Sequence, residues 1–179
     1  SGSNTYSGNT VINKGILKND ASNCLPTSTI LVIGTEDAND ATYVMNGFSQ
    51  TVGGIADGGT TGGTKKITNS GSSATLTVNN TDVYAYSYLI TGAINLTKMG
   101  SAKFTLAGAN TYTGNTTISA GNLCVNGSIA SASAVTVASG ATLSGNGTVS
   151  GNVTVAGEGT LEPGDGNTAT LSTGNLTLN

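Results

Sequence analysis

The chain has 179 residues, only 8% of which are charged, and its formal net charge is −3. It contains no His, and its six basic residues are all Lys. A nucleophile activated by His is therefore excluded, and nucleic-acid binding is disfavoured because Lys65–Lys66 is the longest basic cluster. The longest apolar run, Ile30–Ile33, is much too short to span a bilayer.

Short segments that favour β-strands follow one another along the chain, separated by turns rich in Gly, Asn and Asp. Apolar side chains alternate with Thr or Ser, as in Ala74, Leu76 and Val78, which places them on one face of a strand. No segment has the 3.6-residue apolar stripe of an amphipathic helix. Strands are predicted near 10–12, 15–18, 29–33, 42–45, 50–55, 65–69, 73–79, 88–97, 102–106, 116–119, 122–126, 134–137, 141–143, 147–149, 152–155, 159–161, 169–171 and 174–178.

Many short strands at regular spacing are typical of a β-sandwich, a barrel or a β-solenoid. The monotonous stretch 135–164 and the lack of regular two-residue hairpin turns favour the solenoid, an all-β parallel β-helix. With roughly 20–25 residues per rung, the chain makes about eight rungs. We expect one domain over residues 1–179, with excursions from the coil near 19–45 and 56–72.

A repeat marks the chain: residues 4–17 read NTYSGNTVINKGIL and residues 110–123 read NTYTGNTTISAGNL. The copies divide the domain into units of about 1–105 and 106–179. We interpret Tyr6 and Tyr112 as structural corner residues with hydroxyls near the surface, rather than as ligand-stacking rings. The Asn side chains are expected to hydrogen-bond along the coil axis. The shared positions are Asn4, Tyr6, Gly8, Asn9, Thr10, Ile12 and Gly15, and Asn110, Tyr112, Gly114, Asn115, Thr116, Ile118 and Gly121.

The stretch Lys98–Leu123, KMGSAKFTLAGANTYTGNTTISAGNL, resembles the autotransporter-associated β-strand repeat, also called the passenger-associated transport repeat. Ala102 and Lys103 replace small residues of the family pattern. Segments 46–55, 139–155 and 160–178 are similar to companion segments of the same family, though these are less specific. The resemblance implies a right-handed parallel β-helix, secretion and display on a bacterial surface, and it does not imply an enzyme.

The two ends of the chain also match the repeat. Leu176-Thr177-Leu178 has the pattern of Phe104–Leu106, the strand that leads into the second copy, whereas the first copy lacks such a strand. We therefore expect head-to-tail continuation, either in a longer polypeptide or in a filament, because uncapped rungs favour stacking. The expected contact residues are Ser1, Gly2, Ser3, Leu176, Thr177 and Leu178.

Cys24 and Cys124 leave two interpretations open. A disulfide would close a long loop and contribute about 4–5 kcal/mol on the chain-entropy model. Alternatively, both are small buried hydrophobic residues. No metal site and no cofactor are expected, because two Cys without His make a poor ligand set.

Nine acids are available for carbohydrate chemistry, which needs two carboxylates across the scissile bond. Asp20, Glu36, Asp37 and Asp40 are the candidates near Lys14 and Lys18 in sequence, and solvated loops are the favoured interpretation. The sequence thus predicts a non-enzymatic, extracellular structural module that builds a stalk or filament and mediates display or adhesion. Its expected partners are its own copies or adjoining repeats, a host or neighbouring-cell surface, or carbohydrate. The alternative is a polysaccharide-binding or polysaccharide-cleaving β-helix.

Overall fold

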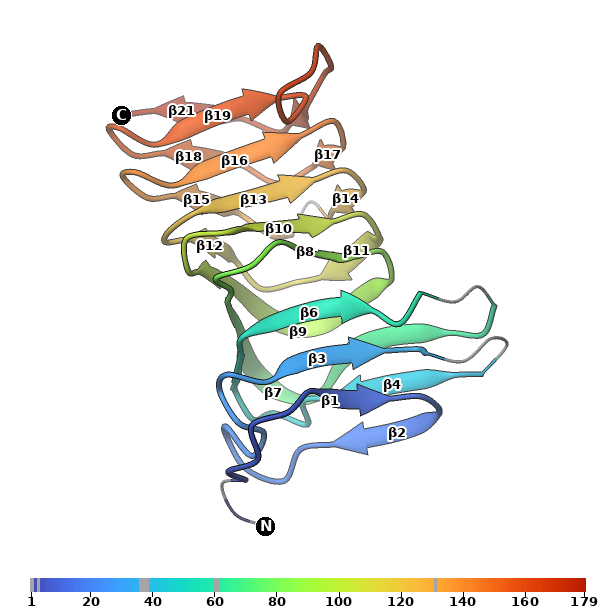
Figure 1. Cartoon of the computed structure of the whole chain (residues 1–179). Coiled ribbons are helices and arrows are strands. Elements are labelled where there is room, and N and C mark those ends of the chain that lie inside the picture. The colour runs from blue at the N-terminus through green and yellow to red at the C-terminus, as the bar shows by residue number, and fades with distance from the viewer. Residues whose placement is uncertain (1, 3, 36–38, 60–61, 131) are drawn as a thin grey trace.

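The computed structural model describes residues 2, 4–35, 39–59, 62–130 and 132–179. Within these residues the chain forms strands and turns and contains no helix. Accordingly, none of the described residues belongs to a helix that could cross a membrane. Every strand pair is parallel, and Figure 1 shows the strands stacked as successive coils about one axis. The predicted β-solenoid of about eight turns is confirmed.

The coils have three faces, which we name by their place in Figure 1. The front face consists of β1 (Thr10–Ile12), β3 (Ile30–Ile33), β6 (Gly54–Asp57), β8 (Tyr84–Tyr86), β10 (Lys103–Leu106), β13 (Asn122–Val125), β16 (Thr142–Gly145) and β19 (Thr160–Pro163).

The right face consists of β2 (Gly15–Lys18), β4 (Ala41–Val44), the first parts of β7 (Lys65–Asn79) and β9 (Leu89–Met99), β11 (Ala109–Tyr112), β14 (Ser128–Ile129), β17 (Thr148–Val149) and β20 (Ser172–Thr173).

The left face consists of β5 (Gln50–Val52), the second parts of β7 and β9, β12 (Thr116–Ile118), β15 (Val135–Val137), β18 (Val153–Val155) and β21 (Leu176–Leu178).

The core is a set of apolar columns that run along the solenoid axis. On the front face Phe104, Leu123 and Leu143 pair in register and are fully buried. Since each strand contributes only two or three inward side chains per coil, the fold needs no large aromatic core. Burial of one such side chain contributes roughly 1.5–3 kcal/mol, so stability accumulates coil by coil.

The front face is divided into two sheets, β1-β3-β6 and β8-β10-β13-β16-β19. At the division Gly54 faces the Tyr84 ring so closely that a Cβ on Gly54 would lie 2.5 Å from Tyr84 Cδ2. The Asp57 carboxylate bridges the division by accepting the Ser87 N–H at 3.0 Å through both oxygens. An aromatic ring and a carboxylate therefore replace the backbone ladder at this position.

Several predicted strand boundaries need correction. Segments 84–86, 109–112 and 128–129 form strands that were not predicted, and the predicted strand 169–171 is wrong, since β20 occupies 172–173. β3 and β4 lie inside the expected excursion 19–45, and β7 begins inside 56–72. The chain therefore leaves the coil less in both regions than the sequence suggested.

Candidate functional site

The second copy of the repeat builds a corner in which Asn110 connects three successive coils. Asn110 is 1% exposed; its Oδ1 accepts the Ile90 N–H at 3.0 Å from the preceding coil. Its Nδ2 donates to Gly108 O at 2.9 Å and to Ser128 O at 3.2 Å, the latter on the following coil. This arrangement satisfies backbone groups that a turn would otherwise leave without partners.

Tyr112 supports the same corner from inside the coil. Its hydroxyl lies 2.7 Å from Thr116 Oγ1, and Thr116 Oγ1 lies 3.1 Å from Ser133 Oγ on the next coil. All three side chains are fully buried, and burial raises the pKa of Tyr112 to about 12. The interpretation as a structural corner residue fits this geometry, but the Tyr112 hydroxyl lies in the core and not near the surface, because the following coil covers it.

The first copy builds the same corner on the first coil. Asn4 Nδ2 donates to Cys24 O at 2.6 Å, and Tyr6 Oη lies 2.5 Å from Thr10 Oγ1. Thr10 Oγ1 in turn lies 2.9 Å from Thr29 Oγ1 of the next coil. Tyr6, however, is 40% exposed, so the first corner has the Tyr–Thr bond and the Asn bond to the next coil but not the burial of the second corner.

In the second copy the motif also places glycine where two coils approach. A Cβ on Gly114 would lie 2.3 Å from Ile94 O, and Asn115 N donates to Asn95 Oδ1 at 3.0 Å. Gly15 and Gly121 both have positive φ, at 86° and 65°. Gly8 and Asn9 of the first copy are exposed.

The left face presents an unbroken column of threonines. Seven Thr residues pair in register, each on its own coil, and no charged residue lies in their column. Adjacent members are separated by about 4.8 Å, the spacing of paired strands. The members are Thr51, Thr77, Thr97, Thr117, Thr136, Thr154 and Thr177.

Behind this column, one Lys points into the core. Lys98 stands between Val78 and Ile118 in an inward column and is 0% exposed. Its Nζ donates to Met99 O at 2.6 Å, Gly100 O at 2.9 Å and Ala120 O at 3.3 Å. Burial lowers the pKa of Lys98 to about 8, so the three carbonyls hold an ammonium group whose charge is poorly solvated.

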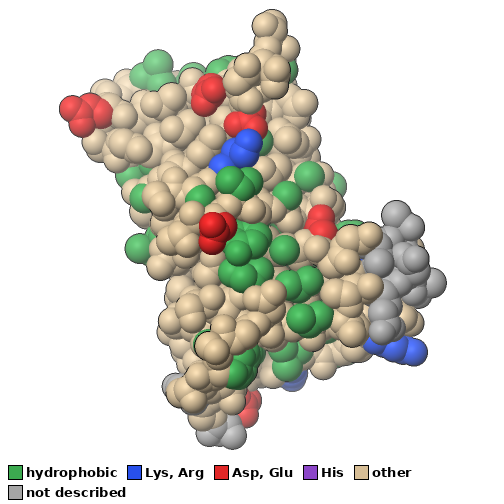
Figure 2. Space-filling view, viewed as in Figure 1, with side chains coloured by type: hydrophobic (Ala, Val, Ile, Leu, Met, Phe, Trp, Pro, Cys, Tyr) green, Lys and Arg blue, Asp and Glu red, His purple; other side chains and the backbone are tan. Residues whose placement is uncertain are grey.

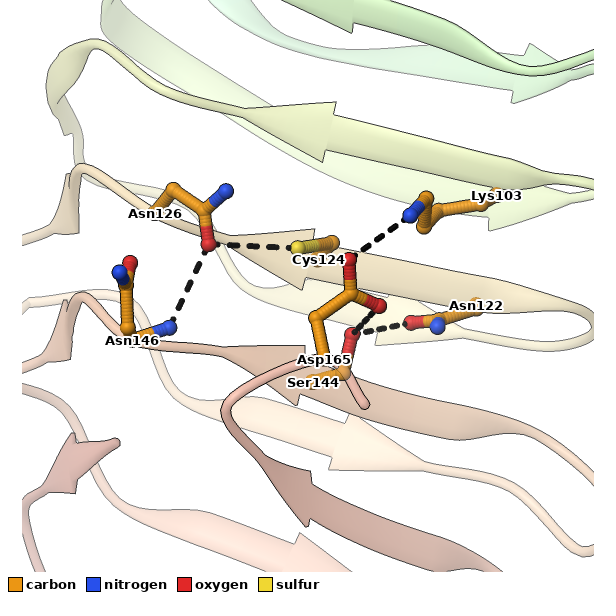
Figure 3. A network of polar contacts seen from close by, with 7 residues as sticks. All are labelled: Lys103, Asn122, Cys124, Asn126, Ser144, Asn146 and Asp165. Atoms are coloured by element: carbon orange, nitrogen blue, oxygen red, sulfur yellow. Dashed lines mark hydrogen bonds and ion pairs between the residues drawn. The ribbon is translucent and has the colours of Figure 1, made fainter. Parts of the chain in front are cut away.

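The front face carries a polar network, drawn in Figure 3. Lys103 Nζ lies 2.7 Å from Asp165 Oδ2. Ser144 Oγ lies 3.3 Å from Asp165 Oδ1 and 2.8 Å from Asn122 Oδ1, so its single proton has two acceptors within reach. Cys124 Sγ donates to Asn126 Oδ1 at 3.3 Å, and that oxygen also accepts the Asn146 N–H at 3.3 Å. Sequence patterns missed this network because Asp165 lies 62 positions from Lys103 along the chain.

Charged side chains are sparse over the surface seen from the front. Figure 2 shows them as scattered spots, with hydrophobic side chains gathered over the middle of the molecule. Several acids serve the fold: Asp40 Oδ1 accepts the Thr64 N–H at 2.6 Å, and Glu158 Oε2 accepts the Ser139 hydroxyl at 3.1 Å. Glu36 and Asp37, two of the candidate acids, lie outside the described residues. Among the residues that are described, no three His, Cys, Asp or Glu side chains gather as a metal site.

The two cysteines are both free and buried, so the disulfide that the sequence allowed is not formed. Cys24 Sγ donates to Asn19 Oδ1 at 3.1 Å near the first coils, whereas Cys124 belongs to β13. The two thiols therefore lie in different parts of the solenoid.

The ends differ in charge and both expose apolar side chains. The first coil exposes Val11 and Ile16, and a hollow of about 410 Å³ is lined by Val11, Ile12, Asn13, Lys14, Ile16 and Leu17. The last strand exposes Leu176 and Leu178. Lys14 and Lys18 belong to the first coil, and Glu158 and Glu162 to the last. Gly2, one of the predicted contact residues, is exposed, while Ser1 and Ser3 lie outside the described residues.

Stacked parallel coils, repeated corners and polar ladders define a β-solenoid scaffold. The family model of the passenger-associated-transport-repeat matches residues 1–18 and 96–124, which contain both copies of the motif. The chain therefore carries this repeat, and the resemblance found in the sequence is confirmed. The repeat and the fold together support an autotransporter passenger module, and the repeat implies a secreted or cell-surface protein. No curated protein and no solved structure matches the chain.

Proposed function

We propose that the chain is an extracellular structural module of a bacterial surface protein that continues end to end into a stalk or filament. The observation that supports this proposal most is the uninterrupted parallel ladder of the right face, which runs from β2 in the first coil to β20 in the last and has an unpaired strand at each end. Unpaired strand edges favour the addition of another strand. The occupant we propose for each end is a further coil of the same kind, from an adjoining repeat or from a second copy.

The chemistry of the two ends supports head-to-tail contact. Lys14 and Lys18 at one end complement Glu158 and Glu162 at the other. Ile16 is 73% exposed and Leu178 is 69% exposed, so both ends offer apolar surface that a further coil would bury. A head-to-tail contact of this kind does not close on itself and extends into a fibre.

The left face is the surface we propose for display and adhesion. Its Thr column offers hydroxyls at the regular spacing of the coils, and the face holds no exposed charge along that column. A polar, regular surface suits weak contacts repeated along a stalk, whose strength grows with the number engaged. A host or neighbouring-cell surface, or a carbohydrate, is the partner we propose for it.

A role as a scaffold, not as an enzyme, is part of the proposal. A glycosidase needs two free carboxylates facing one groove. In this chain Asp40 and Asp57 accept backbone N–H groups, and Asp165 pairs with Lys103. Among the described residues that line the hollow at the first coil there is no carboxylate. These contacts support a structural role for the Asp carboxylates.

The experiment is electron microscopy and light scattering of the purified chain over a range of concentrations. We expect rods whose length grows with concentration. Ile16→Asp and Leu178→Asp should each shorten them, whereas Val83→Asp should not, because Val83 is equally exposed, at 67%, but lies away from the ends. The proposal of end-to-end continuation would be contradicted if the chain stayed monomeric at high concentration. Equal shortening of the rods by all three variants would also contradict it.

A further inference from the structure

Four tripeptides of the form Asn-x-Thr lie in register on the left face. In each of them the Thr belongs to the Thr column, and the Asn stands two positions before it. The tripeptides are Asn95–Thr97, Asn115–Thr117, Asn152–Thr154 and Asn175–Thr177. They form two pairs of neighbouring coils, separated by the coil of β15, which has Ala134 in place of Asn. Figure 1 shows β12, β15, β18 and β21 stacked in this order.

The strand geometry turns both ends of each tripeptide toward solvent. Side chains alternate along a strand, so the Asn and the Thr point outward together while the middle residue points inward. The middle residues Leu96, Thr116 and Val153 are buried, and Leu176 pairs with Val153 in the same column. The sequence Asn-x-Ser/Thr is the acceptor for attachment of a sugar to the Asn side chain in secreted proteins. The left face therefore presents a row of acceptor tripeptides.

Three of the four Asn side chains are exposed and unused by the fold. Asn115, Asn152 and Asn175 are exposed, and within the described part of the chain their carboxamides form no hydrogen bond. Asn is unfavourable in strands, so strand propensity does not account for its recurrence here. Their backbones are fixed, because their carbonyl oxygens accept N–H groups of the preceding coil at 2.8–2.9 Å. The ladder thus holds these residues in place and leaves their amide nitrogens free.

Asn95, in the same column, is used by the fold. Its Oδ1 accepts the Asn115 N–H at 3.0 Å, and its Nδ2 donates to Ser73 Oγ at 3.2 Å. It has the same tripeptide and lies on the same face, but its amide nitrogen already has a partner. Asn95 is therefore an internal comparison for the three free amides.

The chain has three further tripeptides of this form, and all of them lie at corners. Asn79 is the last residue of β7, and Thr81 lies beyond it. Asn126 and Asn146 follow β13 and β16, between the front and right faces. Asn126 Oδ1 accepts both the Cys124 thiol and the Asn146 N–H. These tripeptides share the sequence of the left-face ones but not their placement.

We propose that the left face carries sugars attached to the amide nitrogens of Asn115, Asn152 and Asn175. The co-substrate is a sugar with a diphosphate leaving group on its anomeric carbon, and a separate glycosyltransferase catalyses the transfer. A bond forms between the Asn Nδ2 and the anomeric carbon. The bond from that carbon to the diphosphate oxygen breaks, and the diphosphate leaves with the electron pair. The amide nitrogen gives one proton to a base of the transferase.

The surroundings of the three amides suit an attached sugar. Among the described residues of the Thr column and of the Asn positions beside it, none is charged. The Thr hydroxyls beside each Asn are hydrogen-bond donors and acceptors of the kind that sugar hydroxyls use. A sugar is bulky and polar and stays on the surface, so the buried columns behind the sheet are undisturbed. This inference rests on the proposed extracellular display role of the left face, but it does not depend on end-to-end stacking.

The test is peptide mapping by mass spectrometry of the chain purified from the cells that naturally produce it. We expect added hexose on the peptides that contain Asn115, Asn152 and Asn175, and none on Asn95. Thr117→Val keeps the shape of the side chain and removes the hydroxyl, so it should abolish the sugar on Asn115 alone. Thr136→Val is the matched control: Thr136 belongs to the same column but follows Ala134, so every sugar should remain.

A chain without sugar on the left face would overturn the proposal, including a chain modified only at Asn79, Asn126 or Asn146. Equal modification of Asn95 and Asn115 would also overturn it, because the tripeptide sequence and not the free amide would then select the site. Rod length is read from the same material by electron microscopy. Sugars without rods would therefore contradict end-to-end stacking alone, and rods without sugars would contradict this inference alone.

Discussion

Replacement of Asn110 by Ala tests whether the repeated Asn holds successive coils together. The substitution deletes one acceptor and two donor interactions at a position that is 1% exposed. The Ile90 N–H loses its acceptor, and Ile90 is itself fully buried, so water cannot replace the lost oxygen. Gly108 O keeps a partner, because it also accepts the Ser128 N–H at 3.1 Å.

The magnitude follows from these contacts. A buried donor left without a partner costs about 1–3 kcal/mol, and each net hydrogen bond contributes about 1 kcal/mol. One unpaired N–H and two lost donor bonds therefore predict a loss of roughly 2–4 kcal/mol in the free energy of unfolding. Asn4→Ala is the matched control, since Asn4 is exposed and, within the described part of the chain, its side chain bonds to Cys24 O alone; we expect it to cost less than about 1 kcal/mol.

Urea denaturation followed by circular dichroism gives the free energies, and amide hydrogen exchange locates the effect. Exchange at Ile90 should accelerate strongly in Asn110→Ala and stay unchanged in Asn4→Ala. A solenoid can unfold coil by coil, so the residue-level exchange rate is the decisive measurement. If Asn110→Ala costs no more than Asn4→Ala, the Asn ladder does not stabilise the coil and the reasoning fails.

Three further substitutions test the core and the corners. Tyr112→Phe should lower the free energy of unfolding in urea by about 1–2 kcal/mol, because it removes the buried hydrogen bond to Thr116. Tyr6→Phe should lower it much less, because Tyr6 is exposed, and equal effects of the two variants would contradict this. The pKa of Lys98 lies near 8 in the fold, below its ordinary value of 10.5, so the unfolded chain binds more protons between these two pH values. The free energy of unfolding should therefore rise with pH above about 8. Lys98→Met should flatten that rise, and an unchanged pH dependence in this variant would refute the reasoning. Gly151→Ala places a Cβ 1.9 Å from Ser133 O and should lower the melting temperature by several degrees, at a cost of about 1–3 kcal/mol in the free energy of unfolding. Gly157→Ala, whose Cβ would have its nearest contact at 3.6 Å, should be neutral. Equal melting temperatures of the two variants would count against the close approach.

The solenoid could be predicted from the sequence because apolar residues alternate regularly with Thr or Ser in many of its strands. The strand β11 was missed, since the inward residues of Ala109–Tyr112 are Asn110 and Tyr112, which read as a turn when apolar alternation is the signal. The same signal also missed β8, which begins and ends with Tyr and has no aliphatic alternation, and β14, which is only two residues long. A polar side chain that faces the core because it bonds to neighbouring coils defeats a pattern based on hydrophobicity.

The site was less predictable than the fold. The repeat identified Asn110, Tyr112 and Thr116 because it preserves the corner in sequence. The polar network around Asp165 could not be found in this way, since it depends on which coil lies beside which, and that register places Asp165 next to Lys103. Lys98 reads as an exposed residue in sequence, and only the register with Val78 and Ile118 shows that it faces the core.

The two copies of the repeat occupy different faces of the solenoid, which shows what the motif specifies. Thr10–Ile12 is β1 on the front face, whereas the aligned Thr116–Ile118 is β12 on the left face. Likewise Gly15–Lys18 is β2 on the right face, and its counterpart lies in β13 on the front face. The spacing of the copies is therefore not a whole number of coils, although both corners contain the Tyr–Thr bond and a bond from the Asn side chain to the following coil. The motif encodes a corner and not a face, because its Asn and Tyr bonds need only a coil above. Because the two copies lie one face apart, any feature carried by the corner lies on a different face of the solenoid in each copy.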